Sequence, residues 1–110
     1  MEKVDALDAL AALAQETRLE VFRLLVQAGP QGLAAGEIAE RLGVRQNTMS
    51  SNLAILARAG LVTGERSGRF IRYRADLDGM RDLLAYLMQD CCGGNAEICA
   101  PLADVIACAG

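Results

Sequence analysis

Four cysteines gather near the end of this 110-residue chain, and all of them fall within the last 20 residues. Cys91 and Cys92 are adjacent, and Cys99 follows a segment that contains Gly93 and Gly94. Because glycine adopts turns that other residues resist, this segment lets three sulfur atoms converge on one ion. The sequence contains no histidine, and three thiolates without an imidazole favour a soft, thiophilic ion.

Trivalent arsenic suits three thiolates best, because it forms three bonds to sulfur and needs no fourth ligand. We therefore predict that Cys91, Cys92 and Cys99 bind As(III), or Sb(III), and we expect no organic cofactor. Zinc or cadmium is an alternative that requires a fourth ligand. Cys108, or a carboxylate such as that of Glu97, could supply that ligand.

The composition argues against several classes of protein. A chain without histidine lacks the commonest general base and the usual partner of a nucleophilic serine or cysteine, so we expect no enzyme. The longest apolar runs are six residues, far short of the roughly 20 that span a bilayer. The N-terminus shows no secretory signal, which predicts a cytoplasmic protein with reduced thiols. A thiol redox switch that pairs Cys91 or Cys92 with Cys99 or Cys108 is a further alternative.

Arginines are concentrated in the middle of an otherwise acidic chain. Residues 41–74 carry seven arginines and one acidic residue, although the net charge of the whole chain is −3. A basic block of this kind is typical of a surface that contacts nucleic-acid phosphates. A solvated charged face, or a metal-sequestering or protein-interaction module that does not bind DNA, would also fit the charge count. The secondary-structure elements that carry the arginines decide between these interpretations.

Hydrophobic periodicity and capping residues predict those elements. We expect helices over residues 4–13, from the N-cap Thr17 to the stop at Gly29-Pro30, and over residues 36–42, 46–59 and 77–89. Two extended segments, 61–65 and 69–75, are joined by residues 66–68 and predict a β-hairpin. The fold class is therefore mainly α with a small β-hairpin. Residues 1–89 would form a DNA-binding and dimerisation domain, and residues 90–110 a cysteine-containing metalloid-sensing segment.

Residues 36–59 show the pattern of a helix-turn-helix. The two helices are joined by a short turn at Gly43, and a basic hairpin follows as the wing. Short polar side chains that can reach base edges or phosphates crowd the first turns of the second helix, where backbone N–H groups also attract phosphate. They are Gln46, Asn47, Thr48, Ser50, Ser51 and Asn52.

From about Leu7 to Tyr86 the sequence resembles the ArsR/SmtB family of winged-helix transcriptional repressors. The resemblance is carried by Leu13-Ala14-Gln15-Glu16-Thr17-Arg18-Leu19, Gly43-Val44-Arg45-Gln46-Asn47-Thr48-Met49-Ser50, Ala59-Gly60-Leu61-Val62, Arg66-Ser67-Gly68-Arg69 and Tyr73-Arg74. It implies a homodimer that is paired through the first and last helices of the core. The two recognition helices would enter successive major grooves of double-stranded operator DNA, with inverted half-sites roughly 34 to 36 Å apart.

The resemblance also implies roles for individual residues. The implied DNA-binding residues are Arg45, Gln46, Asn47, Thr48, Ser50 and Ser51 at the recognition helix and Arg66, Arg69 and Arg72 in the wing, where the arginines would hold phosphates. The chain departs from the family at Arg45, where serine is common, and at Ser51 and Asn52, where paired histidines often stand.

The family resemblance bears on the cysteines as well. Many members carry a Cys-x-Cys box on the first helix of the helix-turn-helix, where this chain has Ala34, Ala35 and Ile38. Other members resemble this chain in having a Cys-Cys pair after the last core helix and a third cysteine a few residues later, and these are arsenite-responsive. The resemblance therefore implies a repressor that leaves its operator when a trivalent metalloid binds Cys91, Cys92 and Cys99.

Overall fold

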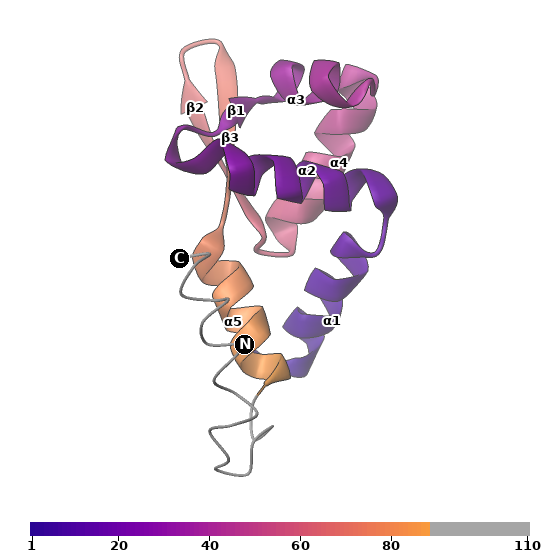
Figure 1. Ribbon diagram of the computed structural model, residues 1–110, viewed down its shortest axis with the longest axis vertical. Helices are drawn as coiled ribbons and strands as arrows, with labels where there is room; N and C mark the ends of the chain where they lie inside the picture. Colours follow the sequence, from indigo (N-terminus) through magenta and orange to yellow (C-terminus); the bar gives the residue numbers. More distant parts are fainter. Residues whose placement is uncertain (89–110) are drawn as a thin grey trace.

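The computed structural model describes residues 1–88, which form five α-helices and a small antiparallel sheet (Figure 1). In chain order the elements are α1 (Lys3–Leu13), α2 (Glu16–Ala28), the 3-10 turn η1 (Gly29–Gln31), β1 (Leu33–Ala34), α3 (Ala35–Leu42), α4 (Gln46–Arg58), β2 (Val62–Ser67), β3 (Phe70–Ala75) and α5 (Leu77–Leu87). The predicted fold class, mainly helical with a β-hairpin, is confirmed. No helix within residues 1–88 is long and apolar enough to cross a membrane.

The start of α2 differs from the prediction that Thr17 caps it. The helix begins at Glu16, and Gln15 is its N-cap, with extended backbone angles. The side-chain Oε1 of Gln15 accepts a hydrogen bond from the backbone N–H of Arg18 at 2.9 Å. Gln15 thus satisfies an N–H group that would otherwise lack a partner in the first turn. The predicted stop is confirmed, because Gly29 ends the helix with φ of +73°.

The sheet contains a strand that the sequence analysis did not predict. Its order is β1-β3-β2, and β1 joins it by pairing antiparallel with β3 at Leu33↔Tyr73 and Ala34↔Arg72. The hairpin turn also differs from the prediction, because Ser67 pairs with Phe70 and residues 68–69, rather than 66–68, form the loop. Gly68 has φ of +63°, a conformation that glycine adopts without strain.

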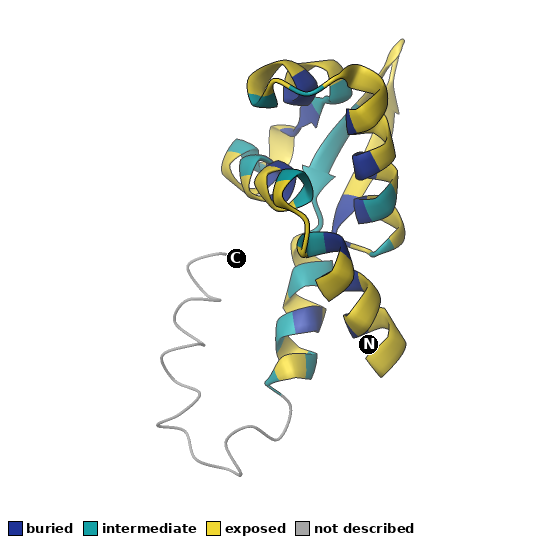
Figure 2. Ribbon diagram, turned by 90° about the vertical axis from the view of Figure 1, so that its right-hand side faces the viewer, coloured by how far each residue is buried: buried dark blue, intermediate teal, exposed yellow. Residues whose placement is uncertain are grey.

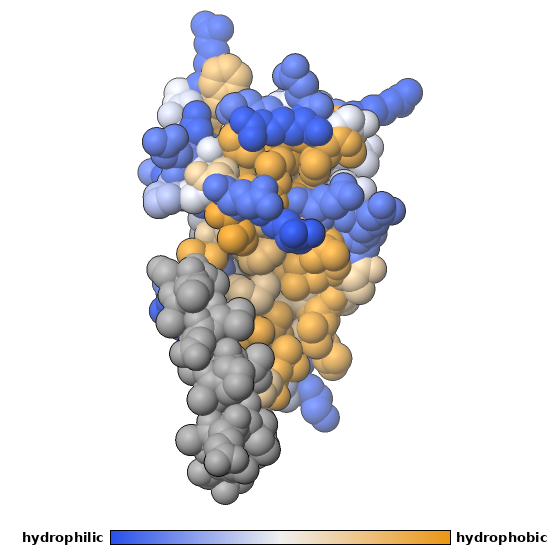
Figure 3. Space-filling view, in the orientation of Figure 1, coloured by the Kyte–Doolittle hydropathy of each residue, from blue (hydrophilic) through white to orange (hydrophobic). Residues whose placement is uncertain are grey.

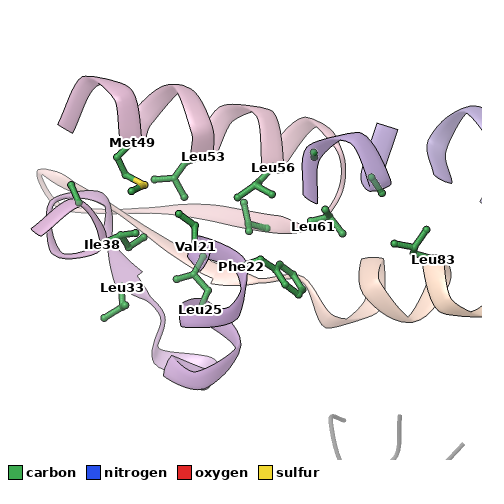
Figure 4. Close-up of a cluster of buried hydrophobic side chains, with 14 of the residues drawn as sticks. Val21, Phe22, Leu25, Leu33, Ile38, Met49, Leu53, Leu56, Leu61 and Leu83 are labelled. Carbon is green, nitrogen blue, oxygen red and sulfur yellow. The ribbon is translucent and has the colours of Figure 1, made fainter. Parts of the chain in front are cut away.

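The hydrophobic core lies where α1, α2, α3 and α4 meet the sheet and α5 (Figure 4). Its large side chains are Val21, Phe22, Leu25, Leu33, Ile38, Met49, Leu53, Leu56, Leu61 and Leu83. Burial of a side chain of this size stabilises a fold by about 1.5–3 kcal/mol. Because α4 and the hairpin pack on the same core, their relative position is fixed.

Helix α1 buries its small residues and exposes its large ones. Ala6, Ala9 and Ala12 are buried, and α1 contacts α2, α4 and α5. On its other side Val4 and Leu7 are each 58% exposed. Figure 2 shows that much of the helix next to the N-terminus is exposed. In Figure 3 the lower right of the surface, where Figure 1 places α1, is largely apolar. α1 thus packs closely on the core and leaves a leucine-rich face uncovered.

Candidate nucleic-acid interface

The turn between α3 and α4 takes its shape from Gly43. This residue ends α3 with φ of +66°, in the left-handed region that favours glycine. The backbone N–H of Val44 then donates to the carbonyl oxygen of Ala39 at 3.0 Å. Arg45 follows in an extended conformation and is the N-cap of α4. The turn between the two helices therefore lies at residues 43–45, as predicted.

The first turns of α4 present the predicted polar side chains to solvent. Met49, Leu53 and Leu56 bury the opposite face of the helix. The exposed residues are Arg45, Gln46, Asn47, Thr48, Ser50 and Ser51. The N-cap Arg45 makes no side-chain capping hydrogen bond. Its guanidinium and the N-terminal backbone N–H groups of α4 create a positive electrostatic potential at the start of the helix, which favours binding of a phosphate.

Asn52 is an exception to the predicted exposure. Its side chain is buried, with an exposed fraction of 7%, on the face of α4 that meets the core. Its Oδ1 accepts a hydrogen bond from Arg18 Nη1 at 3.3 Å. Asn52 therefore lies on the wrong side of α4 for DNA, although it follows directly after Ser51 in the sequence.

The tip of the wing carries two of the predicted arginines. Arg66, near the end of β2, and Arg69, in the loop beside Gly68, are both exposed. Figure 1 places this tip and the α3–α4 turn at the same end of the molecule. Figure 3 shows hydrophilic side chains projecting from that end. The wing and the recognition helix can therefore face one DNA duplex together.

Two other arginines of β3 make contacts within the protein. Arg72 Nη1 donates to the carbonyl oxygens of Gln31 and Gly32, each at 3.1 Å. Arg74 Nη2 lies 2.6 Å from Glu65 Oε2 on the neighbouring strand. Arg72 is thus brought to the base of the wing rather than to its tip. Whether it also holds a phosphate stays a prediction, and 42% of its side chain is exposed.

A groove of about 470 Å³ runs between the wing and the start of the helix-turn-helix. Gln46 and Arg72 line it, together with Glu37 and Glu40 of α3. Phe70 lines it as well and is 67% exposed. From the sequence, Phe70 is expected only as part of the extended segment 69–75, with no role at a site. The alternation of side chains along a strand could have indicated that Phe70 is exposed. Phe70 lies on the same face of β3 as Arg72, and Tyr73, on the other face, packs on the core.

The predicted metalloid ligands Cys91, Cys92 and Cys99 lie outside the described residues. Within residues 1–88 no cluster of three or more histidine, cysteine or acidic side chains could hold a metal ion. Helix α3 contains no cysteine.

The fold and the exposed face together define a winged helix-turn-helix DNA-binding domain. The helix-turn-helix domain family matches residues 13–65 of the chain. The transcriptional activator HlyU of Vibrio cholerae is 30% identical over 97 residues, which cover 86% of this chain and 87% of HlyU. A protein of Halobacterium salinarum whose name describes an arsenical resistance operon repressor is 37% identical over 76 residues, 69% of this chain and 58% of that protein.

Solved structures agree with these sequence relatives. An ArsR-like transcriptional regulator from Rhodococcus sp. RHA1 superposes with a TM-score of 0.70 at 30% identity, over 93% of this chain and 90% of that one. A homodimeric winged helix-turn-helix DNA-binding domain from Mycobacterium bovis does so with a TM-score of 0.64 at 30% identity, over 76% of each chain. The chain belongs to the ArsR/SmtB family of winged-helix transcriptional regulators. The expectation that it is not an enzyme is confirmed, since these relatives are transcriptional regulators.

Proposed function

We propose that this chain is an arsenic-responsive repressor that binds operator DNA as a homodimer and leaves it when As(III) binds Cys91, Cys92 and Cys99. The observation that carries the proposal is the position of these thiols. The Cys91-Cys92 pair follows α5 by only a few residues. α5 contacts α1, whose uncovered leucine face suits a second copy of the chain. Because the pair follows α5 so closely in the sequence, an ion bound by these thiols would act near the proposed dimer interface.

The dimer interface would consist of the apolar side chains that α1 and α5 leave exposed. They are Val4, Leu7, Leu10, Leu77 and Leu87. An apolar face of this kind gains stability when a second copy covers it. The homodimeric relative from Mycobacterium bovis supports this assembly. The dimer would place two α4 helices and two wings on one duplex that carries an inverted repeat.

The donor set fits the metalloid. Three thiolates bind As(III) in a trigonal pyramid without a fourth ligand, and the absence of histidine from the whole sequence removes the imidazoles that zinc sites often use. The Halobacterium relative, whose name describes an arsenical resistance operon repressor, supports the same ligand class. Binding of ion and DNA would be coupled reciprocally, so that each weakens the other.

The test uses full-length protein in a phosphine reductant and a fluorescent duplex selected from a random pool. Arsenite is expected to release the wild-type protein, as measured by anisotropy. Cys91→Ser, Cys92→Ser and Cys99→Ser should each bind the duplex and resist release. Cys108→Ser is the matched control and should respond as the wild type does. If the three variants are released normally, the site assignment is wrong.

Two alternatives are separated by the same assay. A thiol redox switch predicts release by diamide, and no release by arsenite in excess reductant. A zinc or cadmium sensor predicts release by those ions, with Cys108→Ser impaired like the other variants because a fourth ligand is needed. If selection enriches no DNA sequence, the repressor proposal itself fails.

A further inference from the structure

Arg18 joins three helices through one guanidinium. It lies in the first turn of α2, and its Nε donates to the carbonyl oxygen of Ala12 in α1 at 2.7 Å. Its Nη1 donates to Oδ1 of Asn52 in α4 at 3.3 Å. The acceptor on α1 is one of the last carbonyls of that helix, which have no partner within the helix. We call these two hydrogen bonds the Arg18 clasp.

The clasp has a buried polar end. Among residues 1–88, Asn52 is the only buried polar or charged side chain, and its neighbours on that face of α4 are Met49, Leu53 and Leu56. A polar side chain in such a place costs stability unless it is hydrogen-bonded. Its Oδ1 has one partner here, Arg18. Replacing Asn52 alone by an apolar residue would take this acceptor away from Arg18 Nη1, so the asparagine and the arginine form a matched pair.

The clasp borders a cleft of about 360 Å³ between α1 and α4 that is open to solvent and lined by Asp8, Ala11 and Arg18 with Ile55 and Arg58. Buried apolar contact restrains α1 against α4 only on their inner faces. The Arg18 hydrogen bonds therefore add a restraint at the cleft. A planar guanidinium with two fixed donor directions restrains α1 against α4 more than a flexible ammonium would.

We propose that Arg18 is a positioning residue that sets the angle between α1 and α4 and thereby the spacing of the two recognition helices on DNA. This inference rests on the proposed function, because α1 belongs to the proposed dimer face and α4 to the DNA face. Arg18 does not touch DNA in this account. It affects DNA binding through its hydrogen bonds to Ala12 and Asn52.

The first experiment measures the angle itself. Spin labels are placed at Lys3→Cys on α1 and Ala54→Cys on α4, two exposed positions, in a full-length chain whose four native cysteines are replaced by serine. Excess unlabelled protein ensures that only one copy in a dimer is labelled. Pulsed dipolar spectroscopy is expected to give one narrow distance distribution for this parent. Arg18→Met and Asn52→Leu should broaden or shift it.

The second experiment measures affinity for the selected duplex. Arg18→Met, Arg18→Lys and Asn52→Leu should each weaken binding by about tenfold, within the range of coupling between contacting residues. The double variant with Arg18→Met and Asn52→Leu should lose no more than either single variant. Arg23→Met is the matched control, since Arg23 is exposed on the same helix and its loss removes the same charge. It should change affinity by less than about twofold.

The outcomes separate this inference from the proposed function. If Arg18→Met and Asn52→Leu leave the distance distribution unchanged, Arg18 does not position α4, whatever happens to affinity. If the parent binds no duplex, the repressor proposal fails, while the distance measurement still decides whether the clasp sets the angle. Should Arg18→Met fold poorly by circular dichroism, Asn52→Leu, which removes only the acceptor, and Arg18→Lys, which retains the charge, carry the test.

Discussion

Arg72 is hydrogen-bonded to Gly32, with 3.1 Å between Nη1 and the carbonyl oxygen. The same nitrogen donates to the carbonyl oxygen of Gln31, and Nη2 lies 4.0 Å from Glu37 Oε1. These contacts tie the middle of β3 to the segment before β1 and to α3. One of the arginines expected to hold phosphates therefore supports the base of the wing.

Arg72 and Arg69 should consequently give different phenotypes. Arg72→Ala is expected to lower the free energy of unfolding by about 1–2 kcal/mol, because two backbone carbonyls lose a charged donor that solvent partly screens. Arg69→Ala should leave the free energy of unfolding unchanged and weaken only DNA binding. Urea unfolding and anisotropy measure the two effects. Equal stability of the two variants would show that the Arg72 contacts contribute nothing.

Gly32 should not tolerate a side chain. Its φ is +64°, and a methyl group there would overlap the carbonyl oxygen of Tyr73. Gly32→Ala is expected to cost about 1–3 kcal/mol of unfolding free energy. Gly36→Ala is the control, since it lies in α3, where an added Cβ would only come within van der Waals contact of Gln46 Nε2, at 3.8 Å, and it should raise stability by about 0.5–1 kcal/mol. A Gly32→Ala protein as stable as the wild type would contradict the close approach of β1 to β3.

Leu7 should matter for assembly and not for the folded core, because 58% of it is exposed. Leu7→Glu places a charge in the proposed dimer interface and should weaken dimerisation by about 30-fold or more, as loss of a central interface residue does. Operator affinity should fall in parallel. Leu7→Met retains the apolar surface and should remain dimeric. Sedimentation at several concentrations checks this, and a fully dimeric Leu7→Glu protein would exclude α1 from the interface.

Arg66 and Arg69 should set the salt dependence of operator binding. Each phosphate contact that is lost should reduce the slope of log K against log salt by about 0.9. Arg66→Ala and Arg69→Ala are therefore expected to flatten the slope, whereas Arg81→Ala on α5, at the opposite end of the molecule, should not. The measurement is anisotropy over a range of salt concentrations. Unchanged slopes in the wing variants would place the wing off the DNA.

The sequence predicted the helix-turn-helix closely because its signals are local. Gly43 and Gly60 mark helix ends through positive φ angles that other residues resist, and both do so in the structure. The polar run at the start of α4 is exposed as predicted except at Asn52. That exception depends on Arg18, 34 positions away, and no local pattern reveals such a partner.

Other features were beyond local patterns for related reasons. β1 is two residues long, too short for an alternation to show, and exists because β3 pairs with it from about 40 positions further along the chain. α1 has one face rich in alanine and another rich in leucine, and periodicity does not tell which of two apolar faces is buried. Close approach of helices favours the small side chains, and the structure buries the alanines.

The separation of charges along the molecule has a kinetic consequence. The wing tip and the α3–α4 turn, which carry exposed arginines, lie at one end of the molecule, and α1 and α5 lie toward the other (Figure 1). These two helices carry the exposed aspartates Asp5, Asp8, Asp78 and Asp82. A polyanion attracts the first end and repels the second, so it exerts a torque on an approaching molecule before contact. Productive encounters would then begin with the recognition helix already turned toward the duplex.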